Sequence, residues 1–398
     1  MQESLRLRAV QAPIIPVIAD LICRHPGTIS LGQGVVGYGP PPAAIAALAA
    51  FHADPAQHKY QPVAGIPSLL EALARKLAAD HGLATGTTGP RGDSGLRIMV
   101  TAGGNNAFFA AVLALADPGA EFILPTPYYF NHEMAITLAN CRAVLVPTDA
   151  DHQLDLPALR AAITPRTRAI VTVSPNNPTG AVYPERDLRA VGALCAEHRI
   201  CHLSDEAYEA FTYDGARHFS PASSPSAAAH TISLFSLSKS HGFASWRIGC
   251  LVYPARFEAA FRKIQDTLLI CPPVISQFAA VGALAAGPAY LRPHLAALAQ
   301  VRTRVRAELD PLVREGLADV PRADGAFYFL LRVRSPRSPQ ELAERLIREH
   351  GVAVIPGNAF GLDRGCHLRV AYGALTAETA AEGVGRLVRG LRALVPAP

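Results

Sequence analysis

Lys239 is the residue of this sequence best suited to covalent chemistry. It lies in the run Ser236-Leu237-Ser238-Lys239 and is one of four lysines, with Lys59, Lys76 and Lys263, among 37 basic residues. Arginine carries charge, but at ordinary pH it cannot lose a proton and attack a carbonyl, whereas a lysine amine can. A lysine kept in an arginine-rich chain therefore indicates a role for the amine. Arg247, eight residues on, adds an anion-binding group.

Four other segments follow apolar strands and could bind a ligand: Thr101–Asn106, Pro125–Phe130, Ser174–Gly180 and Ser204–Tyr208. In the first, free N–H groups at a helix start favour a phosphate. In the second, an aromatic side chain can stack on a flat ring, and in the third an amide can reach a ligand oxygen. In the fourth, the Asp205 carboxylate can keep a pyridinium nitrogen protonated, and the Tyr208 phenol can bond a ring hydroxyl.

Each segment also has a purely structural interpretation. Tight turns explain most glycine-rich junctions and most Asn-Pro and Thr-Gly pairs. Adjacent aromatics are more often core or interface, an aspartate at a strand end more often caps a helix, and the lysine run alone would be a solvated loop. The combination favours function, because all five segments fall where open α/β sheets bind ligands. Together they supply the groups that pyridoxal phosphate (PLP) requires.

Strands and helices alternate through the middle of the chain and would position these groups. The pattern predicts strands at 97–100, 121–124, 142–146, 167–173, 200–204, 231–236 and 250–253, and helices at 107–115, 156–163 and 184–198. Such alternation predicts an α/β fold with a mainly parallel sheet covered on both faces.

The last third of the chain changes to an α+β pattern. It predicts helices at 289–314, 339–350 and 377–394 and strands at 325–333 and 366–371. We therefore expect three parts: residues 1–45 as an N-terminal arm and part of the small domain, 46–287 as a large PLP-binding domain, and 288–398 as a small C-terminal domain. The segment before Pro42 is expected to pack on the small domain or on a neighbouring subunit.

Composition excludes several classes of protein. Half of the residues are apolar and 17% are charged, which argues against disorder. The net charge of +5 comes without a basic cluster, so no nucleic acid is expected as a partner. The seven cysteines are scattered and never spaced C-x-x-C, which predicts reduced thiols in a cytoplasm and no metal site. The N-terminus does not resemble a signal peptide, and no apolar run suggests a membrane span.

From Ile29 to Leu394 the chain resembles the class I/II aminotransferases, PLP enzymes of fold type I. The matching motifs are Leu31-Gly32-Gln33-Gly34, Tyr60 with Gly65, Gly103-Gly104, Asn177-Pro178-Thr179-Gly180, Asp205-Glu206-Ala207-Tyr208, Ser236-x-Ser238-Lys239 with Arg247, and Arg369. The opening Leu-Gly-Gln-Gly is most similar to the kynurenine/glutamine transaminase branch. The resemblance implies a large α/β domain, a smaller α+β domain and a ping-pong transfer of an amino group between an L-amino acid and a 2-oxo acid.

The resemblance also implies a role for each matching residue. Lys239 would form the aldimine with PLP and shuttle a proton, Asp205 would pair with the pyridinium nitrogen, and Tyr208 would bond the phenolic oxygen together with Asn177. The other cofactor-binding residues would be Gly103, Gly104, Asn105, Ser236, Ser238 and Arg247 at the phosphate, Tyr129 (or Tyr128, if the register slips by one) at the ring, and Tyr60 reaching the neighbouring subunit of a homodimer. Gly34, Asn177 and Arg369 would bind the substrate.

Departures from the family pattern concern the substrate. The usual Pro-Asp-Phe is replaced by Val36-Gly37-Tyr38, which predicts an altered pocket wall, and Ser245 stands where glycine is common. A dicarboxylate would need a cation beyond Arg369, but Ala107–Ala110 is uncharged and Leu268–Val274 is apolar apart from Cys271. We therefore expect neutral or aromatic amino acids.

Three alternatives use the same site or cofactor. An aspartate/glutamate-type aminotransferase would share the mechanism, and a β-lyase, decarboxylase or oxidase would share the substrate carbanion. A PLP-dependent regulator that is not an enzyme is disfavoured, because the segment before the family pattern shows no helix-turn-helix motif.

Overall fold

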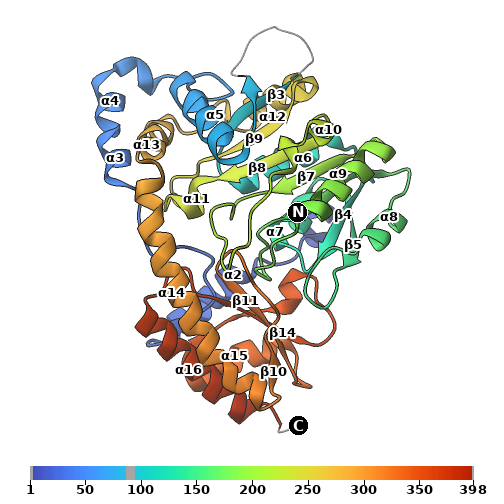
Figure 1. Ribbon diagram of the computed structural model, residues 1–398, viewed down its shortest axis with the longest axis vertical. Coiled ribbons are helices and arrows are strands. Elements are labelled where there is room, and N and C mark those ends of the chain that lie inside the picture. Colours follow the sequence, from blue (N-terminus) through green and yellow to red (C-terminus); the bar gives the residue numbers. More distant parts are fainter. Residues whose placement is uncertain (1–2, 87–94, 397–398) are drawn as a thin grey trace.

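The computed structural model describes residues 3–86 and 95–396 (Figure 1). Its larger sheet has the strand order β2-β3-β9-β8-β7-β6-β4-β5. The strands are β2 (Thr85–Gly86), β3 (Leu96–Thr101), β4 (Glu121–Thr126), β5 (Arg142–Pro147), β6 (Thr167–Val173), β7 (Cys201–Asp205), β8 (Thr231–Ser236) and β9 (Gly249–Pro254). All neighbours are parallel except β9, which runs antiparallel to both β3 and β8. The predicted mainly parallel sheet is confirmed.

Both faces of this sheet are covered because alternate side chains of each strand point to opposite faces. In β4, Phe122 and Leu124 belong to one buried cluster, which also holds Phe108 of α6 (Gly104–Leu115). Ile123 between them belongs to another cluster, with Leu188 of α9 (Glu185–His198). Strands buried on both faces read as continuous apolar runs, which is why the strand predictions were close.

The remaining helices that pack around the larger sheet include several that the sequence pattern did not predict. They are α3 (Pro42–Ala46), α4 (Leu48–Ala53), α5 (Pro67–His81), α7 (Phe130–Leu138), α8 (Leu156–Ala161), α10 (Pro225–Ala228), α11 (Leu237–Ser240), α12 (Glu258–Leu269) and α13 (Val274–Ala285). Of these, α11 is the single turn that carries Lys239, directly after β8.

A second, four-stranded antiparallel sheet has the order β10-β11-β14-β13. Its strands are β10 (Ala318–Asp319), β11 (Tyr328–Val333), β13 (Ile355–Pro356) and β14 (Cys366–Ala371), and it packs with α14 (Gly287–Arg314), α15 (Pro339–His350) and α16 (Ala377–Leu394). β11 begins three residues later than predicted, because Ala326 adopts a left-handed conformation (φ 53°) that ends extended pairing.

The N-terminal segment packs on this second part. α1 (Leu5–Ala9) and α2 (Ile14–Cys23) precede β1 (Ile29–Ser30), which pairs with β12 (Val352–Ala353). Figure 1 shows α14 running from the large sheet down to the small one. The domain limits 1–45, 46–287 and 288–398 stay a prediction, and their first two and last two residues lie outside the described ranges.

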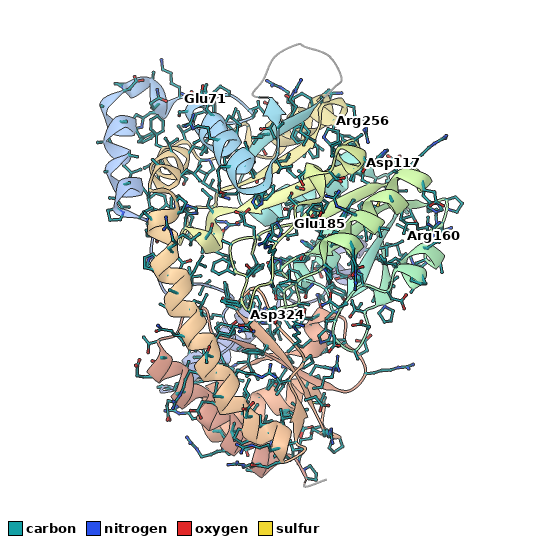
Figure 2. All side chains as sticks on the ribbon, in the orientation of Figure 1. Glu71, Asp117, Arg160, Glu185, Arg256 and Asp324 are labelled. Carbon is teal, nitrogen blue, oxygen red and sulfur yellow. The ribbon has the colours of Figure 1, made fainter. Side chains whose placement is uncertain are left out.

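Charged side chains populate the outside of the molecule (Figure 2). Arg160 of α8, for example, donates to Glu197 of α9 at 2.6 Å; both side chains are exposed, and such a pair adds little stability. Within residues 3–86 and 95–396, no single helix combines the length and apolar composition of a membrane span; α13 and α14, bent by 82° at their junction, meet these criteria only as a pair.

Candidate active site

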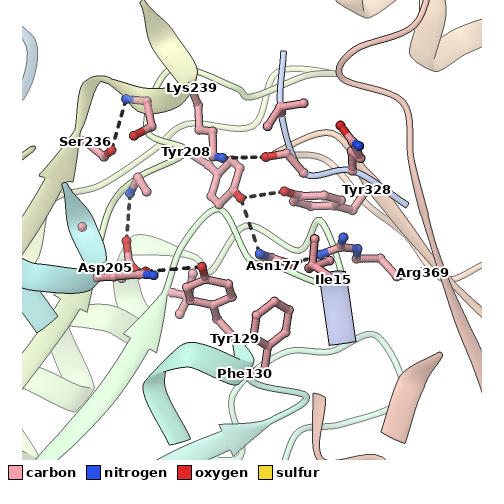
Figure 3. A pocket seen from close by; sticks show the side chains of 18 of the residues that line it. Ile15, Tyr129, Phe130, Asn177, Asp205, Tyr208, Ser236, Lys239, Tyr328 and Arg369 are labelled. Atoms are coloured by element: carbon pink, nitrogen blue, oxygen red, sulfur yellow. Dashed lines mark hydrogen bonds between the residues drawn. The ribbon is translucent and has the colours of Figure 1, made fainter. Parts of the chain in front are cut away.

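A cavity of about 400 Å³ opens at the carboxyl edge of the large sheet. Twelve of the predicted site residues line it: Gly34, Gly104, Asn105, Tyr129, Asn177, Asp205, Tyr208, Ser236, Ser238, Lys239, Arg247 and Arg369 (Figure 3). They come from the ends of β4, β6, β7 and β8, from the start of α6, from the N-terminal segment and from β14. Two predicted residues, Gly103 and Tyr60, do not line the cavity.

The Lys239 amine lies inside this cavity and donates a 2.5 Å hydrogen bond to the Gly34 carbonyl. Burial, with the neighbouring charges of Arg369 and Arg247, lowers the pKa of Lys239 to about 8. Near pH 8 about half of the amines are therefore neutral, whereas an ordinary lysine is almost fully protonated. A neutral amine is the form that attacks a carbonyl.

Tyr38 does not form the pocket wall that the sequence predicted. Its phenol donates to the Lys239 carbonyl at 3.0 Å, and its ring stacks on His294 of α14 with centroids 4.0 Å apart. The Tyr38 side chain therefore contacts the backbone of α11, the turn that carries Lys239. The neighbouring Val35 lines the cavity in its place.

One end of the cavity is built for a phosphate. Gly103, at the N-cap of α6, has φ 81° and leaves the first N–H groups of the helix without a side-chain cap. A Cβ at Gly103 would collide with the Arg247 guanidinium, so glycine is needed for the arginine to lie over the helix start. The hydroxyls of Ser236 and Ser238 line the same cavity. No carboxylate of the described chain forms an ion pair with Arg247, which leaves its charge for an anion.

The middle of the cavity offers partners for a heteroaromatic ring. Asp205, at the end of β7, has one oxygen 3.0 Å from Nε2 of His132 and another that accepts the Ala207 N–H at 3.1 Å. The Tyr129 ring lines the cavity nearby, its hydroxyl bonded to Asn131 and Asn105. Tyr128, the alternative aromatic, instead packs against Gly361 outside the cavity.

The Tyr208 hydroxyl is held by two neighbours. It lies 2.6 Å from the Tyr328 hydroxyl and accepts from Asn177 at 3.4 Å. Burial and the Tyr328 phenol raise the pKa of Tyr208 well above its usual value, so the group is a neutral hydrogen-bond donor. The hydroxyl of Tyr328 also explains Gly34, because a Cβ there would lie 2.5 Å from it.

Arg369 is a buried cation, only 2% exposed, at the end of the cavity opposite the phosphate-binding groups. Its two Nη atoms donate to the Asn177 side chain at 3.0 Å and to the Gly32 carbonyl at 2.6 Å, while Nε has no partner in the described chain. No carboxylate of the described residues forms an ion pair with it. A buried cation without a counter-charge is costly, so this site fits an anionic ligand such as a carboxylate.

Sequence reasoning missed several cavity residues. Ile15 and Val35 reach the cavity from the N-terminal segment, and Tyr328 reaches it from β11. His132 lies behind Asp205 and stacks on Phe108 at 3.9 Å. Only the tertiary arrangement brings Ile15, Tyr328 and His132 to the site, whereas Val35 adjoins the Leu31–Gly34 motif and Phe130 ends the segment Pro125–Phe130, both singled out from the sequence.

Comparison with known proteins agrees with this geometry. The family model "Aminotransferase class I and II" matches residues 26–387. The aromatic aminotransferase ISS1 of Arabidopsis thaliana is 31% identical over 98% of this chain and 97% of its own, and the aspartate/prephenate aminotransferase of Thermus thermophilus is 37% identical over 84% and 83%. A solved double mutant of the Thermus thermophilus aspartate aminotransferase superposes with a TM-score of 0.88, at 32% identity, over 98% of this chain and all of that one.

The Arabidopsis thaliana relative and the solved structure each cover 98% of this chain. The narrower resemblance to the kynurenine/glutamine branch stays a prediction. The protein belongs to the class I and II aminotransferases, a PLP-dependent family, and catalyses the transfer of an amino group between amino acids and 2-oxo acids.

Proposed function

We propose that the cavity holds PLP with Lys239 as the residue that binds it covalently. One observation carries this proposal. Lys239, a lysine of lowered pKa, lines the same cavity as two cations that can bind anions, Arg247 and Arg369, and as the Asp205 carboxylate. When bound, PLP supplies an electron-withdrawing ring that stabilises negative charge on the substrate Cα.

The residues of the chain then have distinct tasks. Asp205 keeps the ring nitrogen protonated, while the start of α6 with Gly103, Gly104 and Asn105, together with Ser236, Ser238 and Arg247, binds the phosphate. Tyr208 and Asn177 donate to the phenolic oxygen, and Tyr129 supplies an aromatic face. Arg369 would bind the substrate carboxylate, and the Lys239 amine would move a proton at the substrate Cα. Two half-reactions in sequence give ping-pong kinetics.

We further propose that neutral and aromatic amino acids are the preferred donors. The charged residues that line the cavity are Asp205, Lys239, Arg247 and Arg369, and each already has a task. No cation among the described lining residues is left for a second carboxylate. The rest of the wall is uncharged: Gln33 is polar, Tyr328 is aromatic with a hydroxyl, and Ile15, Val35, Phe130, Val173 and Ala207 are apolar. A dicarboxylate side chain would lose its hydration there without gaining a counter-charge.

Initial rates with a panel of amino acids test this preference. With pyruvate or 2-oxoglutarate as acceptor, we expect kcat/KM for phenylalanine to exceed that for aspartate by roughly 10²-fold, the scale of an unpaired buried charge. Ile15→Arg places a cation in the apolar wall and should narrow that ratio at least tenfold, whereas Ile15→Leu should preserve it. Equal rates with aspartate in the unmodified enzyme would contradict the proposal. Release of pyruvate without an acceptor would indicate lyase chemistry.

We also propose a cytoplasmic homodimer in which Tyr60 reaches the cavity of the partner. All seven cysteines are unpaired, which suits a reducing compartment. Tyr60 is 79% exposed, and Ile45, Ile270 and Ile275 also expose apolar surface. A second copy of the chain would cover such side chains.

Sedimentation tests whether the chain forms a dimer, and titration with PLP tests whether Tyr60 contributes to cofactor binding. We expect a dimer mass, and we expect Tyr60→Phe to weaken PLP binding roughly 10- to 100-fold, as the loss of one hydrogen bond to a charged group predicts. Thr303→Val, which removes an exposed hydroxyl of α14, serves as the control. A monomer that binds PLP with full affinity would rule out the shared site.

A further inference from the structure

A second group of charged side chains is buried directly behind the cavity. Lys76 of α5, one of the four lysines, lies 2.5 Å from a carboxylate oxygen of Glu209, and the other oxygen contacts His81 at the end of the same helix. Glu206 lies 2.8 Å from His218 and accepts from Ser220 at 3.1 Å. None of these side chains lines the cavity, so the proposed chemistry leaves this cluster unexplained.

The cluster and the cavity occupy opposite sides of one turn of chain. After β7 the backbone forms a turn in which the Glu209 N–H bonds the Glu206 carbonyl at 3.0 Å. Asp205 and Tyr208, three residues apart, line the cavity. Glu206 and Glu209, also three apart, contact the buried cluster behind it. Any shift of the two glutamates therefore moves the two cofactor-facing side chains.

The cluster attaches the later part of this turn to the large domain. The register pairing of β7 ends at Asp205, and one further backbone bond, from the Glu206 N–H to the Leu234 carbonyl at 2.8 Å, holds the start of the turn on β8. By contrast, α5 is fixed in the core of the large sheet by buried Leu69, Leu73 and Leu77. The Lys76 and His81 contacts thus attach the turn to a rigid helix.

The charged side chains of the cluster stabilise one another in their ionised forms. Although burial opposes ionisation, Lys76 and His81 hold the pKa of Glu209 well below its usual value. Burial likewise opposes charge on His81, but the Glu209 hydrogen bond and charge outweigh it and raise the pKa of that imidazole. The Lys76 ammonium also pairs with the exposed Asp80 at 3.1 Å, so Glu209 depends on His81 as well as on Lys76 for compensation of its charge. Removal of one partner leaves a buried charge without compensation.

We infer that Glu209, held by Lys76 and His81, is a positioning residue that sets Tyr208 and Asp205 against the cofactor. The inference rests on the proposed binding of PLP in the cavity. It assigns a function to the half-buried Lys76, whose amine serves as a fixed cation that orients the turn and takes no part in the chemistry.

The test compares Glu209→Gln with Glu121→Gln in the PLP-loaded enzyme. Glu121 is also a buried carboxylate, paired with Arg166 at 2.7 Å, but it lies at the opposite end of the sheet, at the start of β4. When the Tyr208 hydroxyl donates to the phenolic oxygen of the bound cofactor, it favours the unprotonated form of that cofactor. Glu209→Gln should therefore raise the pH midpoint of cofactor absorbance by about one unit and lower kcat about tenfold, with little change in KM. Glu121→Gln should leave both values at those of the unmodified enzyme.

A double variant keeps the test decisive if Glu209→Gln alone does not fold. Lys76→Met with Glu209→Gln removes both charges together, so folding should recover while the midpoint stays raised. The inference is overturned if Glu209→Gln or the double variant binds PLP with an unchanged midpoint and kcat. Failure of PLP binding itself would be visible in the unmodified enzyme, which would show no cofactor absorbance, and would count against the proposed function instead.

Discussion

Lys239→Ala will lower kcat by roughly 10⁴-fold, the largest loss expected from any single substitution. The amine is both the group that captures the cofactor and the base that moves the substrate proton, and positioned acid–base groups alone contribute about 10²- to 10⁴-fold. Among the residues that the structure describes, no other lysine lines the cavity. Steady-state turnover of the best amino acid with pyruvate measures the effect.

Two controls separate this loss from a loss of folding. Lys263→Ala changes an exposed lysine of α12 and should keep full turnover. The rate at which the unmodified protein binds PLP covalently should also depend on the protonation of the Lys239 amine. This rate should rise with pH and level off above about 8, because the pKa of Lys239 is lowered to about 8. Full turnover by Lys239→Ala would refute the assignment.

Arg369→Lys will lower kcat/KM for amino acids by roughly 10²- to 10³-fold. Lysine keeps the charge but loses the planar fork that can bind both carboxylate oxygens. It also cannot reproduce the bonds that Arg369 donates to Asn177 and Gly32, nor its position over the Tyr328 ring at 4.6 Å. The lost interaction is a charge-assisted pair in a buried site, worth about 2 to 5 kcal/mol when one partner is removed.

The substrate provides the control for this substitution. An amine with the same side chain but no carboxylate cannot use Arg369, so its slow reaction should change little in Arg369→Lys. Arg160→Lys, on the exposed face of α8, should change neither substrate. An equal loss for the amine and the amino acid would show that Arg369 acts through the shape of the site and not through the carboxylate.

Most of the large sheet could be predicted because its strands are buried on both faces. Thr167–Val173 and Thr231–Ser236 were predicted with their correct ends, and turn residues bound each run. The antiparallel direction of β9 could not be predicted, since a buried apolar run reads the same in either direction. The helix α5 was not predicted, although its buried leucines recur with helical spacing. The start of β11 was placed too early, because the left-handed backbone angle of Ala326 cannot be read from the sequence.

Residues of the site could be predicted where only a few residue types can perform the required chemistry. Lys239, Asp205 and Asn177 follow strands, and the topology of a parallel sheet brings such positions to one edge. Tyr38 was misplaced because the sequence does not reveal which way a loop side chain points; its phenol bonds the Lys239 backbone. Glu206 belonged to a matching motif but had no role of its own, and Glu209 was not singled out, because their contacts depend on the packing of α5 behind the turn.

The central claim is that Lys239 binds the cofactor, and borohydride reduction followed by peptide mapping tests it most directly. Reduction makes the bond between a lysine amine and a carbonyl compound permanent, and four lysines make the map simple to read. The account predicts one label per chain, on the peptide that contains Lys239, and loss of that label when the enzyme is first treated with an amino donor. A label on Lys76 or Lys263, or none at all in a PLP-saturated active enzyme, would contradict it.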